Sequence, residues 1–252
     1  MKATKIGVQL HPQDTTVDEL RTAWKAADSL GADSIFLWDH FYPLYGDPDA
    51  RHYECYTLLA AMAAETSHAQ LGALVTCNSY RNPDLLADMS RTIDLISGGR
   101  FILGIGSGWF ERDYDEYGYE FGTARGRLDA LAEALPRIKA RIARLTPSPT
   151  GPMPILIGGS GEKVTLRIVA EQGDMWNTFG PADHFAQKNA ILNDHCAAVG
   201  RDPSEIERTI AINAGEIDDI PAFVEAGATH MILMMPPPFN MADLERALAH
   251  RS

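Results

Sequence analysis

The most constraining feature of this chain is a regular alternation of short apolar runs with longer amphipathic segments, with glycine or proline at the joins. We predict strands at the apolar runs, which are residues 5–10, 33–38, 70–76, 100–105, 154–158, 174–178, 207–213 and 229–234. We predict helices at the amphipathic segments, which are residues 16–30, 53–66, 83–97, 123–144, 161–172, 182–199, 218–226 and 240–250. Strict alternation predicts a parallel sheet, and eight such units fit about 250 residues, so the pattern indicates an α/β fold of the (β/α)8, or TIM barrel, type.

One break in composition interrupts this alternation. Residues 145–154 contain four prolines, which is typical of a linker or of an irregular loop. Because the alternation continues on both sides of this stretch, we interpret it as a surface loop. The sequence therefore predicts one domain that spans residues 1–252.

Charge and cysteine content argue against several classes of partner. The 252 residues include 22 basic and 34 acidic side chains, and the net charge of −12 argues against a nucleic-acid-binding surface. Cys55, Cys77 and Cys196 are far apart and form no Cys-x-x-Cys motif, so we expect free thiols in a reducing compartment. No apolar run approaches the roughly 18 residues of a membrane helix, and no signal segment follows Met1. We therefore expect a cytoplasmic protein with no membrane partner.

Polar side chains follow the predicted strands. In a parallel barrel the active site lies at the carboxyl ends of the strands. The apolar runs of this sequence end in residues with hydrogen-bonding or acid–base chemistry, which are Gln9, His11, Asp39, His40, Thr76, Asn78, Ser107, Ser160, Asn177 and Asn213. We therefore predict a site for a small-molecule substrate at this end of the barrel.

Two glycine-rich segments also follow predicted strands. Gly158-Gly159-Ser160-Gly161 precedes a predicted helix, and glycines beside a helix N-terminus allow backbone N–H groups to bind a phosphate. The alternative is a tight turn in which the serine caps the helix. The other segment, residues 104–108, lacks the third glycine of a dinucleotide-binding motif. We expect its glycines to let a flat ring or a phosphate-bearing chain approach the strand.

His40 is the strongest acid–base candidate, because an imidazole exchanges protons near neutral pH. Asp39 precedes it and would point the opposite way unless the strand has already ended. His11, Asp39 and His40 together could supply three metal ligands, but no His-x-His or Glu-x-x-His spacing supports a metal site. We therefore predict that His40 transfers protons and that no metal is bound.

Several segments together are similar to a known family. They extend along most of the chain and comprise residues 65–76, 80–83, 94–101, 103–109, 154–163 and 170–174. In these segments the sequence resembles the luciferase-like monooxygenase superfamily, in its branch of deazaflavin-dependent oxidoreductases. The resemblance implies a (β/α)8 barrel, coenzyme F420 as the cofactor, and a homodimer.

The resemblance also implies roles for individual residues. Asp39 matches a position near the ring hydroxyl of the deazaflavin, and His40 matches a catalytic position over the reacting carbon. A bulge with a non-proline cis peptide at Leu74–Val75 would support the ring from behind. The other implied cofactor contacts, to the ring, the ribityl chain or the phosphate, are Thr76, Gly106, Ser107, Gly108, Gly158, Gly159, Ser160 and Gly161.

The sequence departs from the family in two respects. Residues 145–153 are shorter than the usual insertion at this place, and the region after the seventh predicted strand is also trimmed, so we expect an open substrate site. Trp109 stands where some sugar-phosphate dehydrogenases of this branch carry an acidic residue, which argues against a sugar-phosphate substrate. The sequence identifies no proton-donor partner for His40.

The leading hypothesis is an F420-dependent oxidoreductase that transfers a hydride between the deazaflavin C5 and a small organic substrate. One alternative is an FMN-dependent monooxygenase, because both cofactors have a tricyclic ring and a phosphate. Another alternative is a cofactor-binding protein with little catalysis. A metal- or phosphate-dependent hydrolase or isomerase lacks the required ligand spacing.

Overall fold

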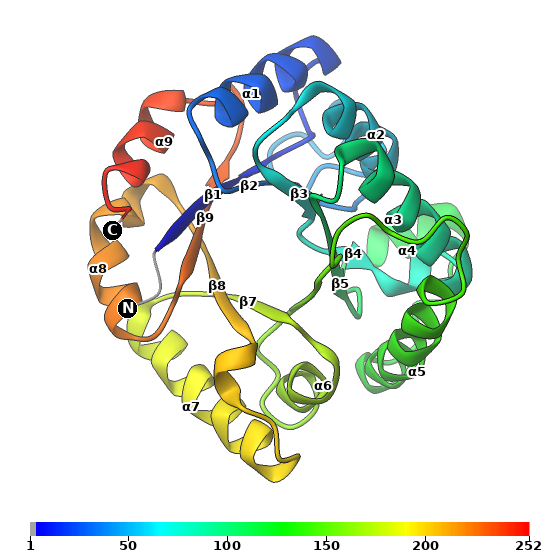
Figure 1. Cartoon of the computed structure of the whole chain (residues 1–252). Coiled ribbons are helices and arrows are strands. Elements are labelled where there is room, and N and C mark those ends of the chain that lie inside the picture. The colour runs from blue at the N-terminus through cyan, green and yellow to red at the C-terminus, as the bar shows by residue number, and fades with distance from the viewer. Residues whose placement is uncertain (1–3, 252) are drawn as a thin grey trace.

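The computed structural model describes residues 4–251 and has a closed ring of parallel strands surrounded by helices (Figure 1). The strands are β1 (Lys5–Leu10), β2 (Ser34–Leu37), β3 (Gln70–Ala73), β4 (Thr76–Cys77), β5 (Phe101–Gly106), β6 (Ile155–Gly158), β7 (Met175–Phe179), β8 (Glu207–Ile212) and β9 (His230–Met235). The α-helices are α1 (Val17–Ser29), α2 (Cys55–Glu65), α3 (Pro83–Ser97), α4 (Glu111–Tyr117), α5 (Ala124–Ile142), α6 (Thr165–Gln172), α7 (Ala182–Ala198), α8 (Ile220–Glu225) and α9 (Met241–Leu248). Three short 3-10 helices are η1 (Asn78–Tyr80), η2 (Pro203–Glu205) and η3 (Ala214–Asp219).

The strand pairing closes the barrel. β1 pairs in parallel with both β2 and β9, so the first and last strands are neighbours. β3 and β4 both pair with β5, so they are two segments of one barrel strand. Nine segments therefore fill eight positions, and the predicted (β/α)8 barrel is confirmed.

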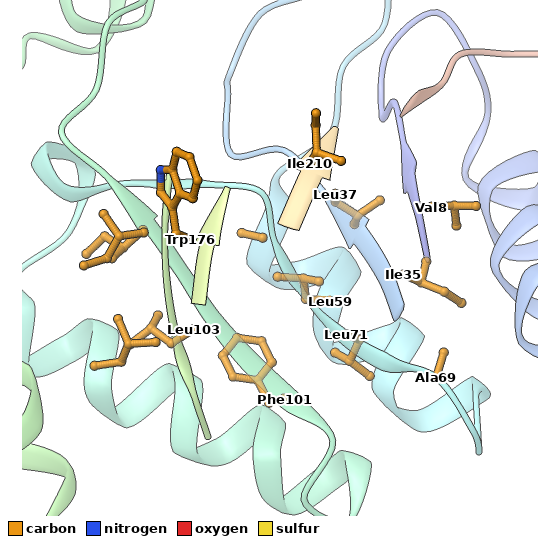
Figure 2. Close-up of a cluster of buried hydrophobic side chains, with 14 of the residues drawn as sticks. Val8, Ile35, Leu37, Leu59, Ala69, Leu71, Phe101, Leu103, Trp176 and Ile210 are labelled. Atoms are coloured by element: carbon orange, nitrogen blue, oxygen red, sulfur yellow. The ribbon is translucent and has the colours of Figure 1, made fainter. Parts of the chain in front are cut away.

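Alternation along each strand separates two apolar layers. On β5, Phe101 and Leu103 face outward into the large core between the strands and the helices (Figure 2). Ile102 faces inward and packs with Phe36 and Leu156 in a smaller core inside the barrel. Because successive strand residues point to opposite sides, one strand contributes to both layers, which explains why the strands read as continuous apolar runs.

The predicted strand at residues 70–76 is interrupted. β3 ends at Ala73, the peptide bond between Leu74 and Val75 is cis, and pairing resumes in β4. Neighbouring strands satisfy the backbone of the interruption: the Leu74 N–H donates to the Leu37 carbonyl at 2.7 Å, and the Gln9 side-chain amide donates to the Leu74 carbonyl at 2.5 Å. The bulge implied by the family resemblance is present at the expected peptide.

The other differences from the sequence predictions concern the helices. The helix predicted from residue 161 begins at Thr165, because residues 162–164 form a turn instead. The segment predicted as a helix at residues 218–226 divides into η3 and the short α8. The helix α4 was not predicted at all. No helix within residues 4–251 combines the length and the apolar character needed to span a membrane.

The proline-rich stretch lies in the loop between α5 and β6, which is held against α3. The Arg91 guanidinium donates to the Pro147 carbonyl at 2.9 Å, and the Asp94 carboxylate accepts the Thr150 N–H at 2.7 Å. Residues 143–154 therefore form an ordered connection on the outside of the barrel.

Candidate active site

A cavity of about 450 Å³ lies at the carboxyl ends of the strands. Most of the residues predicted for the site line it, namely Asp39, His40, Leu74, Val75, Thr76, Gly106, Ser107, Gly108, Gly158 and Gly159. Ser160 and Gly161 do not line this cavity, but they border a separate, more open pocket beside the same turn. A cavity at this end of a parallel barrel is the usual location of the active site in TIM-barrel enzymes.

Val75 and two inward-facing glycines form part of the cavity floor. A Cβ atom at Gly106 would lie 2.8 Å from Val75 Cγ2, and one at Gly158 would lie 3.0 Å from Val75 Cγ1. The distance at Gly106 is too short for a Cβ atom and the distance at Gly158 is tight, so glycine at these positions makes room for the valine of the bulge. Gly106 and Gly158 therefore shape the cavity indirectly, because they set the position of Val75.

His40 is held on the cavity wall by a buried carboxylate. Its Nδ1 lies 2.7 Å from Oδ2 of Asp113, a fully buried residue of α4. The ring also packs edge-on against Trp109 and Phe110, with ring centroids 5.7 and 5.5 Å apart. These contacts from three sides fix the orientation of the imidazole.

The contacts of Asp113 determine which nitrogen of His40 carries the proton. Asp113 Oδ1 accepts the backbone N–H groups of Phe41 and Tyr42, at 3.1 and 3.2 Å, and Oδ2 accepts the Tyr80 hydroxyl at 2.9 Å. A carboxylate with these donors can only accept from His40, so Nδ1 is the protonated nitrogen of the neutral ring. The lone pair of His40 is therefore on Nε2, on the far side of the ring from Asp113, where it can accept a proton.

Asp39 points away from His40 and binds an arginine. Its carboxylate accepts two hydrogen bonds from the Arg81 guanidinium, at 2.6 and 2.9 Å, and one from the Cys77 N–H at 3.1 Å. Burial by itself lowers the pKa of Arg81, but the charge and hydrogen bonds of Asp39 outweigh it and raise the pKa above its usual value. Because β2 ends at Leu37, both side chains reach the cavity wall, and Asp39 does so as one half of an ion pair.

Two further histidines pack against Trp38 and are neutral. His11 stacks on Trp38 with ring centroids 4.2 Å apart, and His52 accepts a hydrogen bond from the Trp38 indole at 2.9 Å. Burial lowers the pKa of each of these histidines to about 4. Near neutral pH they therefore add no positive charge to the site.

The glycine-rich turn after β6 has its first peptide groups occupied and the following ones open. The Gly159 N–H donates to the Asn177 carbonyl at 2.9 Å, and the Gly159 carbonyl accepts the Trp176 indole at 2.8 Å. The N–H groups of residues 160–164 donate no hydrogen bond within the described part of the chain. These five consecutive N–H groups before α6 are therefore left without a partner among the described residues, and unpaired N–H groups at a helix N-terminus are the kind of donor that anions bind.

No metal centre accompanies these groups. Within residues 4–251 no three His, Cys, Asp or Glu side chains lie together in a way that could hold a metal ion. Cys55, Cys77 and Cys196 are buried free thiols, and burial raises the pKa of each.

Comparison with known proteins places the chain in a family. The sequence profile described as luciferase-like monooxygenase matches residues 2–216. An F420-dependent glucose-6-phosphate dehydrogenase of Kineococcus radiotolerans is 29% identical over 238 residues, which cover 86% of this chain and 69% of that protein. An F420-dependent secondary alcohol dehydrogenase, solved with an F420–acetone adduct, matches with a TM-score of 0.86 at 19% identity and covers 96% of each chain.

A flavin enzyme shares the same fold. The oxygenating component of 3,6-diketocamphane monooxygenase of Pseudomonas putida, a type II Baeyer–Villiger enzyme solved with FMN, matches with a TM-score of 0.78 at 14% identity. That match covers 98% of this chain and 97% of the other. The chain belongs to the luciferase-like monooxygenase family, a family of oxidoreductases, as its sequence segments predict.

Sequence reasoning missed the residues that hold the two central side chains. Asp113 positions His40, and Arg81 binds Asp39, but neither was assigned a role from the sequence. The signal for Asp113 is weak because it lies among Glu111, Asp115 and Glu116, and their order does not show which acid faces the barrel.

Proposed function

We propose that this protein binds coenzyme F420 and transfers a hydride between the deazaflavin C5 and a small organic substrate. The observation that carries the proposal is the His40–Asp113 pair on the wall of a largely apolar cavity, which is lined by the first glycines of a turn with open N–H groups. The F420-dependent enzymes among the similar proteins support it.

The residues present fit such a cofactor. A cavity of about 450 Å³ with aromatic and aliphatic walls suits a planar ring, and Val75 would lie behind that ring. The open N–H groups of residues 160–164 would bind the phosphate, together with the positive end of the α6 dipole. Asp39, paired with Arg81, would lie near the ring as a fixed hydrogen-bonding group.

The protein's contribution to the reaction is orientation and proton transfer. F420, when bound, supplies or accepts the hydride. In carbonyl reduction, His40 Nε2–H would give its proton to the substrate oxygen as the carbonyl carbon takes up the hydride, so that an alcohol would form. Asp113 balances the charge of the doubly protonated imidazole before this step and keeps Nδ1 protonated after it. In alcohol oxidation the same nitrogen takes up the proton.

An FMN-dependent monooxygenase is the second candidate, and the FMN-containing structural neighbour is the observation that favours it. Titration of the purified protein with F420 and with FMN, followed by fluorescence quenching, discriminates between the two. We expect micromolar or tighter binding of F420 and much weaker binding of FMN. Tight FMN binding without F420 binding would contradict the proposal.

Replacing His40 by Ala tests the catalytic part of the proposal. We expect turnover to fall about 10²- to 10⁴-fold, the usual contribution of a positioned proton donor, while F420 affinity changes little. Unchanged turnover would remove His40 from the mechanism. F420 binding by the wild-type protein with no turnover on a broad panel of alcohols and ketones would favour a cofactor carrier.

A further inference from the structure

Three of the exposed aromatic side chains of this protein line the cavity at the carboxyl ends of the strands. Among the described residues, four are exposed: Tyr45 and Trp109 at 64%, Phe179 at 59% and Tyr117 at 55%. The first three line the cavity, and we call them the aromatic rim. They come from separate parts of the chain, namely the loop after β2, the loop after β5 and the end of β7. Large aromatic surface left in water at one place is typical of a binding site.

The rim lies beside the proposed proton donor. Trp109 contacts the edge of His40, with ring centroids 5.7 Å apart. The loop that carries Tyr45 is pinned to the barrel by Gln13, whose side-chain amide donates to the Tyr45 carbonyl at 2.8 Å and accepts the Leu44 N–H at 2.7 Å. A molecule within reach of His40 would therefore touch the rim.

The cavity offers no free positive charge. No lysine, arginine or glutamate is found among the described residues that line it, and the carboxylate of Asp39 is already paired with Arg81. The nearby Arg112 is bound to Asp49, and the Arg127 guanidinium donates to the Gly108 carbonyl at 3.1 Å and to the Phe121 carbonyl at 2.8 Å. A phosphate or carboxylate placed at the rim would lose hydration and gain no ionic partner.

We propose that the aromatic rim selects uncharged substrates with a planar, apolar body and excludes anionic ones such as sugar phosphates. This inference rests on the proposed function, since it names the substrate class of the same site. The rim side chains cover the body of the substrate, and its polar carbon–oxygen group faces His40. Trp109 is the main specificity residue because it lines the cavity and is the rim side chain that packs against the imidazole.

A matched pair of probes tests the charge preference. Acetophenone is an uncharged aromatic ketone, and 4-acetylbenzoate has the same body with an added carboxylate. Titration calorimetry on the F420-loaded protein should show acetophenone binding at least about tenfold more tightly, the scale on which such sites discriminate. Equal or tighter binding of 4-acetylbenzoate or of glucose 6-phosphate, or no binding of acetophenone up to its solubility limit, would overturn the inference.

Substitutions in the aromatic rim test which side chains cause the preference for the uncharged probe. Trp109→Ala and Phe179→Ala should each weaken acetophenone binding about tenfold, while Tyr117→Ala, equally exposed but outside the cavity lining, should leave it unchanged. Trp109→Arg should raise the affinity for 4-acetylbenzoate relative to acetophenone, because it supplies the missing cation. If the rim variants changed the oligomeric state in light scattering and left probe binding unaltered, the rim would be a protein contact and the inference would be wrong.

A measurement of F420 affinity before any probe is added separates two kinds of failure. If F420 does not bind, the proposed function fails. If F420 binds normally and the probes show the wrong preference, only the inference about the substrate class fails.

Discussion

His40 owes its orientation to a residue 73 positions later in the chain. The imidazole is one member of a network in which Asp113 also accepts the Tyr80 hydroxyl and two backbone N–H groups. Such a network is costly to leave half satisfied in a buried place, so its members hold one another in a single arrangement. At the scale of the residue, the orientation of His40 is therefore set by the side chains and backbone groups around Asp113.

Asp113→Asn tests this dependence. An asparagine keeps the shape but can donate to Nδ1 through its amide, which would move the ring proton to Nε2 and remove the balancing charge. We expect turnover to fall about 10²-fold or more, with F420 affinity retained and the pH dependence of turnover altered. Asp115→Asn, on the exposed side of the same helix, is the control and should behave like the wild type. Equal turnover in both variants would show that Asp113 has no positioning role.

At the scale of the element, the sequence predicted the strands and helices well and their interruptions poorly. The period of the apolar residues reports burial averaged over several positions, which is enough to recognise each barrel unit. The interruption at Leu74 depends on contacts with Leu37 and Gln9 on other strands, which periodicity does not contain. The bulge was expected only through the family resemblance.

The residues of the candidate site also include some that the sequence could predict and some that it could not. Residues at strand ends, such as His40 and Ser107, could be predicted because the carboxyl ends of barrel strands meet. Asp113 lies on α4, a helix of seven residues that is too short to produce a clear periodic signal. Its inward direction is fixed by the tertiary structure around it.

The packing of Val75 against the inward glycines gives a prediction at this scale. Gly106→Ala should destabilise the protein by about 1–3 kcal/mol, because the new methyl group would lie 2.8 Å from Val75 Cγ2. Adding Val75→Ala should recover part of that loss, and urea unfolding of the single and double variants measures both effects. Gly215→Ala, where nothing lies within 4 Å of the added atom, should change stability by no more than about 0.5 kcal/mol. A Gly106→Ala variant as stable as the wild type would refute this account of the glycine.

At the scale of the whole molecule, a polar network closes the end of the barrel opposite the cavity. Glu207 of β8 binds Lys5 of β1 and His230 of β9, each at 2.7 Å, and His230 in turn lies 2.8 Å from the hydroxyl of Ser34 on β2. The order Ser–His–Glu is that of a hydrolase triad, but Ser34 is completely buried, so no substrate can reach it. The network instead joins the first and last strands of the chain.

This network makes barrel stability depend on pH. Burial alone raises the pKa of Glu207, but the hydrogen bonds and charges of His230 and Lys5 outweigh it and lower the pKa from 4.5 to about 2. A depressed pKa in the folded state stabilises the protein above the unfolded value, and this contribution, at most about 3 kcal/mol, is lost as pH falls from about 4.5 to about 2.

Glu207→Gln should therefore lower the free energy of unfolding at pH 7, and the gap to the wild type should narrow as pH falls from about 4.5 to about 2. Urea unfolding at several pH values measures this gap, with the exposed Glu225→Gln as the control. A gap that stays constant down to pH 2 would show that the charge of Glu207 is not the cause. The homodimer expected from the family resemblance stays a prediction, and light scattering of the purified protein checks it.

The solid interior below Val75 has a kinetic consequence. Phe36, Ile102, Leu156 and Ile232 pack with Leu74 of the bulge in an apolar cluster that fills the inside of the barrel, and the cavity lies at the carboxyl ends of the strands. When two reactants enter a cavity from the same side, the one that binds deeper binds first and dissociates last. Initial-rate kinetics should therefore show a compulsory-order mechanism, in which the more deeply bound molecule dissociates only after the outer one has left.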